Sequence, residues 1–342
     1  MRHNISFPLF LLPFTLLAFS SCSSTETFPD RPEEKSNLVN LSVTTPDSYI
    51  FGHTTRADDG NFQLRLKAWL YPLNENGKAE PDVAPAYTYE TLHSDNETTL
   101  SFEIDNPGEY CVFVFADYIP VGAEAANGHF PDKYYDTTIP GKITIKAAGN
   151  DDNINDFFNT DNRDCFIGKL AFTKKLNSIS KELKLSRPIS RVLLTSTADA
   201  VEQLIESIDI TACSHLDTYN FTIDNTDTVG TATETPSDPL KDYGEVKVNP
   251  VNKELFYFYT FAGEYADDNR AALGAISFAL NARDNIKLEN DTRTVAEGLI
   301  KPAQNYKITV NGSKGWISAE AGADDIIVNI DLSTDWTGTI NK

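Results

Sequence analysis

Basic residues are scarce in this chain: 29 Lys and Arg stand against 50 Asp and Glu in 342 residues, which gives a net charge of −21. Nucleic-acid binding without sequence preference needs Lys and Arg to replace phosphate counterions, so the charge argues against that function. Hydrophobic residues make up 40% and aromatic residues 11%, which is enough for a buried core and excludes disorder throughout the chain. The length predicts about two domains.

Sequence motifs of enzymes and metal sites are missing as well. The chain has no G-x-S-x-G, no P-loop and no G-x-G-x-x-G after a strand. Its five histidines are scattered and none has a metal-binding spacing such as H-E-x-x-H; they are His3, His53, His93, His129 and His215. We therefore expect a protein that is not an enzyme, with no catalytic residues, no metal and no cofactor.

Long apolar runs are absent beyond the N-terminus, and the run there, residues 7–19, is shorter than the about 20 residues that a spanning helix needs. It follows Arg2 and precedes Ser20-Ser21-Cys22, the pattern of a secretory signal with small residues before a cut. Because a cysteine follows the small pair, residues 1–21 resemble a bacterial lipoprotein signal peptide. We expect lipidation of Cys22 and a flexible spacer at residues 22–36. The alternative is an ordinary signal peptide with an incidental cysteine.

Cysteine is scarce too, with four in the whole chain. Beyond the lipidation candidate these are Cys111, Cys165 and Cys213, without C-x-x-C or Cys–His spacing, which argues against a zinc site. In an exported protein, two of the three could form a disulfide and leave one thiol. Cys111 lies in an apolar run at residues 110–115, so we expect it to be a buried free thiol.

Period-two alternation, by contrast, is abundant and predicts β-strands. Residues 38–43 and 62–71 both alternate. In the second run, the even-numbered residues from Leu64 to Leu70 face one side and the odd-numbered residues from Arg65 to Tyr71 face the other. Residues 100–104 and 110–118 are expected to form a hairpin around Asn106-Pro107-Gly108, because Pro presets φ and Gly accepts the left-handed conformation.

Many short strands separated by turns are typical of β-sandwiches, so we expect an all-β protein. Further strands are expected at residues 189–194, 255–261, 275–280, 306–310 and 326–330. One short helix is expected at residues 198–208, where a Thr197 cap precedes apolar residues at helical spacing. A break near residues 181–185 divides the chain into an N-terminal sandwich at 37–183 and a C-terminal sandwich at 184–342.

Four short motifs give the chain a family resemblance. They are Thr54-Thr55-Arg56-Ala57-Asp58 after the first strand, Gly108-Glu109-Tyr110 with the apolar strand that follows, Asp164-Cys165-Phe166-Ile167-Gly168, and Leu185-Ser186-Arg187-Pro188 at the start of the second half. With the lipoprotein signal, they resemble the fimbrillin-like lipoproteins of Bacteroidota, of the major and minor fimbrial subunit type. The resemblance extends over about residues 36–340.

The resemblance implies two transthyretin-like, Greek-key β-sandwiches in a lipid-anchored protein of the outer membrane that is exposed at the cell surface. It also implies that a protease cuts after Arg56, which leaves Ala57 as the new N-terminus and removes the first strand. A strand of another subunit, or of a second copy, then fills the groove by β-augmentation. Residues 326–332 are the expected donor. The alternative is that Arg56 is an ordinary exposed loop residue.

The expected function is therefore that of a fimbrial or adhesin-like surface lipoprotein, with other fimbrial subunits and host or bacterial surface ligands as partners. The alternative is a glycan-binding outer-membrane lipoprotein of a polysaccharide-uptake system, which would use Trp69, Trp316 and Trp336 as an aromatic platform. Two Asp-Thr triplets, at Thr137 and Thr228, resemble O-glycosylation acceptors of these bacteria, and both are expected in loops.

Overall fold

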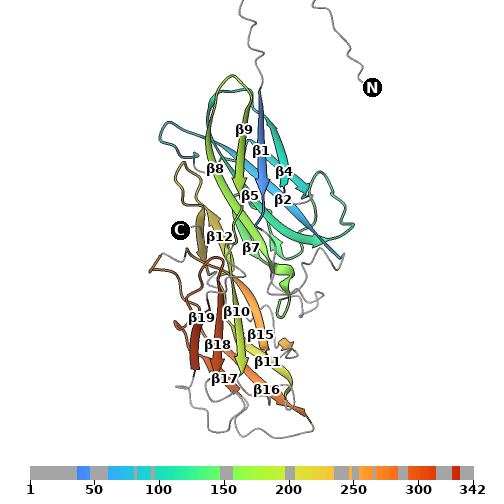
Figure 1. The fold of residues 1–342 in the computed structure, drawn as a ribbon, viewed down its shortest axis with the longest axis vertical. Coiled ribbons are helices and arrows are strands. Elements are labelled where there is room, and N and C mark those ends of the chain that lie inside the picture. The colour runs from blue at the N-terminus through green and yellow to red at the C-terminus, as the bar shows by residue number, and fades with distance from the viewer. Residues whose placement is uncertain are drawn as a thin grey trace, which may run out of the picture. The chain divides into compact units, whose positions relative to one another are not determined.

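The computed structural model describes residues 37–46, 61–80, 83–93, 97–146, 157–196, 205–234, 246–248, 254–264, 267–283, 292–312 and 326–331 (Figure 1). Apart from one 3₁₀ turn, η3 (Asp161–Arg163), the regular elements of these residues are β-strands. The expected all-β fold is therefore confirmed. The described part of the chain holds no helix with the length and apolarity needed to cross a bilayer.

The first sheet has three strands in the order β4 (Glu97–Glu103), β1 (Leu38–Thr44), β9 (Ile179–Lys184). The central strand β1 runs antiparallel to β4 and parallel to β9. Its alternation is confirmed, because Val39, Leu41 and Val43 are each at most 1% exposed while the residues between them are partly exposed. One face of this sheet therefore belongs to a core.

The second sheet lies against that apolar face and has the order β3 (Tyr87–Leu92), β2 (Phe62–Leu73), β5 (Gly108–Pro120), β8 (Cys165–Lys174). In β2, Leu66, Ala68 and Leu70 pack with the buried side chains of β1, as the alternation predicts. The opposite face is buried too, with Trp69 and Tyr71 in a separate core cluster. Strand β5 is buried on both faces, as its continuous apolar run indicates.

A third sheet covers this opposite face, in the order β13 (Gly230–Thr233), β12 (Thr218–Phe221), β7 (Lys142–Ile145), β6 (Tyr135–Asp136). Phe221 of β12 connects the two sheets, with its ring centroid 4.8 Å from that of Phe113 and 6.2 Å from that of Trp69. Strands from both sides of residue 184 share this sheet, because β12 pairs with β7. The division into sandwiches at 37–183 and 184–342 stays a prediction.

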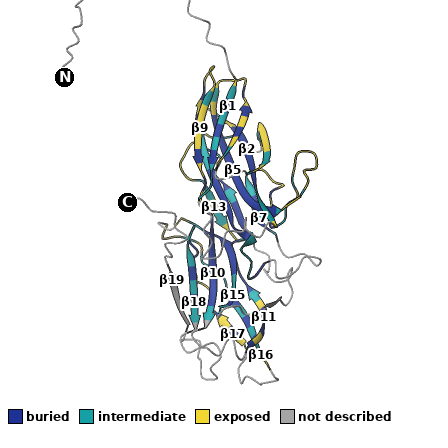
Figure 2. Ribbon diagram, turned by 45° about the vertical axis from the view of Figure 1, so that its right-hand side comes forward, coloured by how far each residue is buried: buried dark blue, intermediate teal, exposed yellow. Residues whose placement is uncertain are grey.

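Two further sheets pack together in the second half of the chain. One has the order β15 (Glu254–Phe261), β10 (Ile189–Ser196), β18 (Lys307–Gly312), β19 (Ile326–Asp331). The other has the order β14 (Val246–Val248), β11 (Ile205–Cys213), β16 (Ile276–Ala282), β17 (Thr292–Val295). Phe256 and Phe278 meet between the two sheets, with centroids 5.3 Å apart, and Figure 2 shows buried residues along β10 and β15.

The prediction of a helix at residues 198–208 is wrong for residues 205–208. Residues 205–208 begin strand β11, while residues 198–204 lie outside the described residues. The pairing register of β11 shifts between Ile205 and Ser207, so Ile205 and Ile208 both face the core. Their spacing is that of apolar residues on one face of a helix, although both lie in a strand. Isoleucine, branched at Cβ, also favours a strand over a helix.

Candidate functional site

Several predicted functional residues fall outside the described residues. These are the lipidation candidate Cys22, the processing pair Arg56 and Ala57, and two of the three platform tryptophans, Trp316 and Trp336. Lipidation and processing therefore stay predictions. The third tryptophan, Trp69, is 1% exposed and packs against Phe221, so it cannot belong to an exposed aromatic platform.

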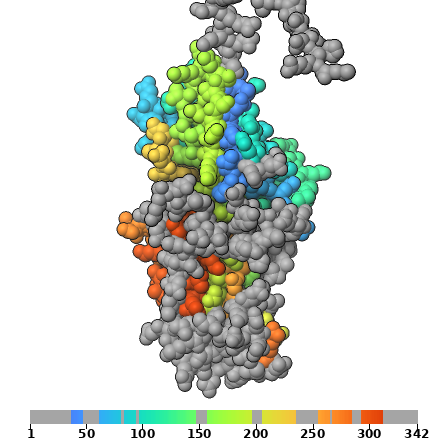
Figure 3. All heavy atoms as spheres, in the orientation of Figure 1, coloured from blue at the N-terminus to red at the C-terminus, as the bar shows by residue number. Residues whose placement is uncertain are grey.

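Strand β1, which the resemblance marks for removal, is the central strand of its sheet. It pairs with β4 over Leu38–Thr44 and with β9 over Val39–Thr44, so both of its edges are hydrogen-bonded. Figure 3 shows the blue atoms of β1 at the surface beside the yellow-green atoms of β9. Its partly exposed residues face outward and its apolar residues fill a groove over the second sheet.

Two of the motifs that carry the family resemblance meet in a buried ion pair. Arg187 donates from Nε to Asp164 Oδ1 at 2.9 Å and from Nη2 to Asp164 Oδ2 at 2.9 Å, and neither residue is more than 2% exposed. The guanidinium also lies over the Phe166 ring, 4.9 Å from its centroid. Nearby, a Cβ on Gly168 would lie 2.6 Å from a methyl carbon of Leu185, so this close packing needs glycine. These motifs therefore have a structural role.

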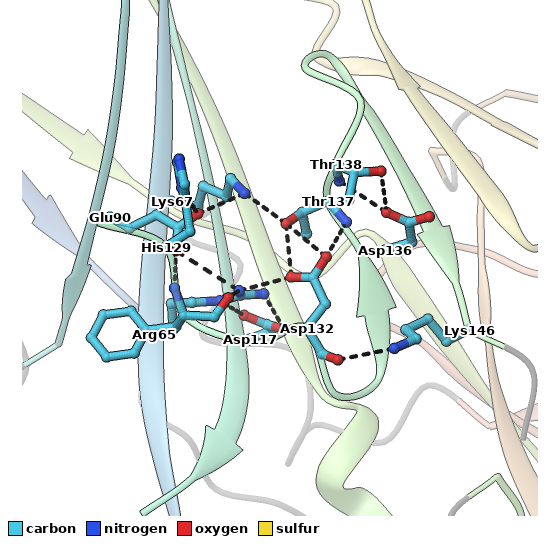
Figure 4. Close-up of polar contacts among 11 residues, drawn as sticks. Arg65, Lys67, Glu90, Asp117, His129, Asp132, Asp136, Thr137, Thr138 and Lys146 are labelled. Carbon is cyan, nitrogen blue, oxygen red and sulfur yellow. Dashed lines mark hydrogen bonds and ion pairs between the residues drawn. The ribbon is translucent and has the colours of Figure 1, made fainter. Parts of the chain in front are cut away.

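A network of charged residues crosses the face of the second sheet that carries Trp69 (Figure 4). At its centre Arg65 of β2, 0% exposed, donates two hydrogen bonds to Asp117, its partner on β5, at 2.8 and 2.9 Å. Its third nitrogen donates to Asp132 at 2.8 Å and to the carbonyl oxygen of Phe130 at 3.2 Å. Burial lowers the pKa of Arg65, but the two carboxylates outweigh burial and raise it above its usual value.

Lys67, two residues further along β2, forms the second ion pair of this network. Its Nζ lies 2.6 Å from Oε1 of Glu90, its partner on β3, and donates to Thr137 Oγ1 at 2.9 Å. Glu90 also accepts from the backbone N–H of Phe130 at 2.8 Å and lies 3.1 Å from His129 Nδ1. Burial raises the pKa of Glu90, but the hydrogen bonds from Lys67, Phe130 and His129 outweigh burial and lower it below its usual value.

Asp132 connects the segment between β5 and β7 to the second sheet through hydrogen bonds. Besides Arg65, its carboxylate accepts from the backbone N–H of Thr137 at 2.7 Å and from Thr137 Oγ1 at 2.9 Å. Its carbonyl oxygen accepts from Lys146 Nζ at 3.0 Å. The expected glycosylation site Thr137 is thus 1% exposed, with its hydroxyl between Lys67 and Asp132, and a sugar on that oxygen does not fit the folded chain. Thr228, the other candidate, is exposed in a loop as expected.

Beside this network lies a pocket of about 560 Å³. Its lining combines charged, hydroxyl and apolar side chains: Lys67, Trp69, Thr88, His129, Phe130, Asp132, Thr137, Thr138, Pro140 and Lys146. The volume falls in the range typical of small-molecule sites, about 300–1,000 Å³. Sequence reasoning placed Arg65 and Lys67 on one face of a strand but missed the pocket, because their partners come from distant parts of the chain.

The three described cysteines, Cys111, Cys165 and Cys213, are buried and form no disulfide with one another. Burial is the largest cause that raises the pKa of the Cys111 thiol, to about 12. The expectation of a buried free thiol at Cys111 is therefore confirmed. Among the described residues, no group of three or more His, Cys, Asp or Glu side chains is placed to hold a metal ion.

The described residues thus define an all-β protein of stacked sheets that carries a pocket with a charged lining on one sheet. The chain belongs to the family of unknown function DUF6562, whose model matches residues 32–313. The comparison with curated proteins finds no match.

Solved structures similar to this chain include two fimbrial proteins. A fimbrial assembly protein from Parabacteroides distasonis is 15% identical over 86% of this chain and 98% of its own, with a TM-score of 0.40. The tip fimbrial protein Mfa3 from Porphyromonas gingivalis is 12% identical over 86% of this chain and 98% of its own, with a TM-score of 0.37. The predicted resemblance to fimbrial proteins of Bacteroidota is therefore confirmed. At such identities and TM-scores, these likenesses carry no argument about what this chain does.

Proposed function

We propose that this chain is a cell-surface assembly or attachment protein that exchanges strand β1 for a strand of another subunit. The observation that carries the proposal is the position of β1 (Leu38–Thr44), a central strand in a three-stranded sheet at the start of the described chain. Removal of an edge strand would leave one open edge. Removal of β1 leaves two, on β4 and β9, above an exposed apolar groove.

The groove offers a donor strand both apolar burial and backbone pairing. Val39, Leu41 and Val43 are each at most 1% exposed, and burial of such side chains contributes about 1.5–3 kcal/mol each, or roughly 5–9 kcal/mol together. The two hydrogen-bonded ladders add backbone pairing on both sides of the strand. A donor strand with the same alternation would recover both contributions, which is the basis of β-augmentation.

Processing after Arg56 would release β1, because Arg56 lies in the sequence between β1 and β2 (Phe62–Leu73). We propose Ala57 as the N-terminus of the assembling form. As the donor we propose β19 (Ile326–Asp331), which lies at the edge of its sheet and pairs with β18 alone among the described strands. An edge strand leaves its sheet with the loss of a single ladder.

A lipid on Cys22 would hold the unprocessed chain at the outer membrane, with β1 still in its groove. The partners are then other fimbrial subunits or further copies of this chain. We retain Thr228 as a proposed O-glycosylation site, because the residue is exposed.

Digestion of the mature chain with an arginine-specific protease, followed by size-exclusion chromatography, tests the proposal. The wild-type chain should form oligomers once Arg56 is cut, and the Arg56→Ala variant should stay monomeric under the same digestion. An excess of a synthetic peptide of residues 37–46 should block the oligomers, because it refills the groove. A chain that begins at Ala57, has lost β1 and remains monomeric would overturn the proposal.

A further inference from the structure

We infer that the pocket beside Arg65 and Lys67 binds a sugar acid, that is, a saccharide ring that carries a carboxylate. The inference rests on the lining of the pocket and is independent of strand exchange. It differs from the aromatic-platform hypothesis, because Trp69 contributes only part of one wall.

The pocket is built on buried charged residues. Arg65, Glu90 and Asp117 are 0% exposed at their side chains. Replacement of a buried ion pair by apolar residues of similar volume is often neutral or stabilising, so stability alone does not favour these residues. Through their hydrogen bonds to Asp132 and Phe130, Arg65 and Glu90 fix two parts of the pocket lining. Such a rigid, charged surround is typical of binding sites.

The hydrogen-bonding capacity that is left over in the pocket is mainly that of donors. Each ammonium group has three protons. Lys67 uses two, toward Glu90 and Thr137, and its Nζ lies 5.6 Å from the centroid of the Trp69 ring, whereas Lys146 uses one, toward the carbonyl oxygen of Asp132. The Asp132 carboxylate, by contrast, has both oxygens engaged. A ligand therefore meets cationic donors rather than open carboxylates, which favours an anion.

Figure 4 shows Lys67 and Lys146 on opposite sides of Asp132. Lys67 reaches the Asp132 carboxylate through Thr137, whereas Lys146 contacts the carbonyl oxygen of Asp132. A small inorganic anion can therefore satisfy one ammonium group, but a larger ligand with several oxygens can contact both. The imidazole of His129, 55% exposed at its side chain, adds a further polar group at the rim.

The rest of the lining fits a pyranose ring. Thr88 and Thr138 supply hydroxyl groups, and Trp69, Phe130 and Pro140 supply apolar wall. A sugar ring presents hydroxyls around its perimeter and C–H groups on its faces, so it needs both kinds of surface. The carboxylate supplies the negative charge that the two lysines favour.

Calorimetric titration of the mature chain with D-glucuronate tests the inference, with D-glucose as the neutral match and acetate as an anion without a ring. Glucuronate should bind saturably with a Kd below about 1 mM, and glucose and acetate at least about tenfold more weakly. A methyl glucuronide and a disaccharide ending in glucuronate show whether a free sugar acid or the end of a glycan is the better ligand. Absence of saturable binding by all these acids, or equal binding of glucose, would overturn the inference.

Lys146→Met removes one ammonium group from the rim and should weaken glucuronate binding about tenfold. The matched control is Lys142→Met, four residues earlier and outside the pocket lining, which should leave binding unchanged. Lys67→Met alone would leave Glu90 buried without the nearest of its ion-pair partners, so the double variant Lys67→Met/Glu90→Gln serves in its place and should also lose affinity. Unchanged affinity in Lys146→Met and in the double variant would contradict the assignment.

Discussion

Substitution of Leu41 by alanine tests how firmly β1 is held in its groove. Leu41 is 1% exposed and packs between the first two sheets. The change removes three carbon atoms, which at about 0.8 kcal/mol each is roughly 2.4 kcal/mol of transfer free energy. The cavity left behind adds to this, so we expect a loss of about 2–5 kcal/mol in the free energy of unfolding.

Urea denaturation followed by circular dichroism measures this loss as a shift of the unfolding midpoint. Ser42→Ala is the matched control, because Ser42 is the next residue on β1, faces outward, and donates its hydroxyl hydrogen bond to Glu97 at the surface. It should change the free energy of unfolding by no more than about 0.5 kcal/mol. Equal losses of unfolding free energy in the two variants, or a loss below about 1 kcal/mol for Leu41→Ala, would contradict the burial of Leu41 in the groove.

Two further predictions concern ion pairs. Burial raises the pKa of Asp224, but hydrogen bonds from Lys169 and other donors outweigh burial and lower this pKa to about 2. The ionised carboxylate therefore stabilises the fold at neutral pH, and this contribution is lost as the pH falls from about 4 through 2. The unfolding free energies of wild type and Asp224→Asn, compared over this pH range, should converge at the acid end. Asp164→Leu should cost about 3–5 kcal/mol, because it removes the carboxylate that the buried Arg187 contacts, and the double variant Asp164→Leu/Arg187→Met should recover much of this loss. Arg187→Met completes the double-mutant cycle, and additive losses of the two single variants would contradict the pairing.

The strands with simple alternation could be predicted from the sequence. In β1 (Leu38–Thr44) one apolar face is buried against another sheet, and burial alternates along the strand. In β2 (Phe62–Leu73) both faces are buried, but aliphatic residues on one face alternate with charged and aromatic residues on the other, so the period of two is still visible in the sequence. The hairpin expected around Pro107 and Gly108 is wrong: β4 pairs with β1, whereas β5 pairs with β2 and β8, so these residues lie in a connection between two sheets. The helix assigned to residues 198–208 failed where a bulge in β11 changes the period.

The charged pocket could not be predicted, because its contacts are not local. Arg65 meets Asp117 and Asp132, which lie 52 and 67 residues away in the sequence, and a pattern shows only that Arg65 is charged. Thr137 illustrates the same limit: its neighbours are typical of a loop, yet hydrogen bonds to Lys67 and Asp132 bury it. Burial of a polar side chain depends on partners that only the folded chain brings together.

The N-terminus of the protein recovered from the native cell surface, determined by mass spectrometry, tests the central claim most directly. Strand exchange predicts a chain that begins at Ala57, since β1 must leave its groove before another strand can enter. A chain that begins only at acylated Cys22 retains β1, and its presence in assembled material would contradict strand exchange as the means of assembly.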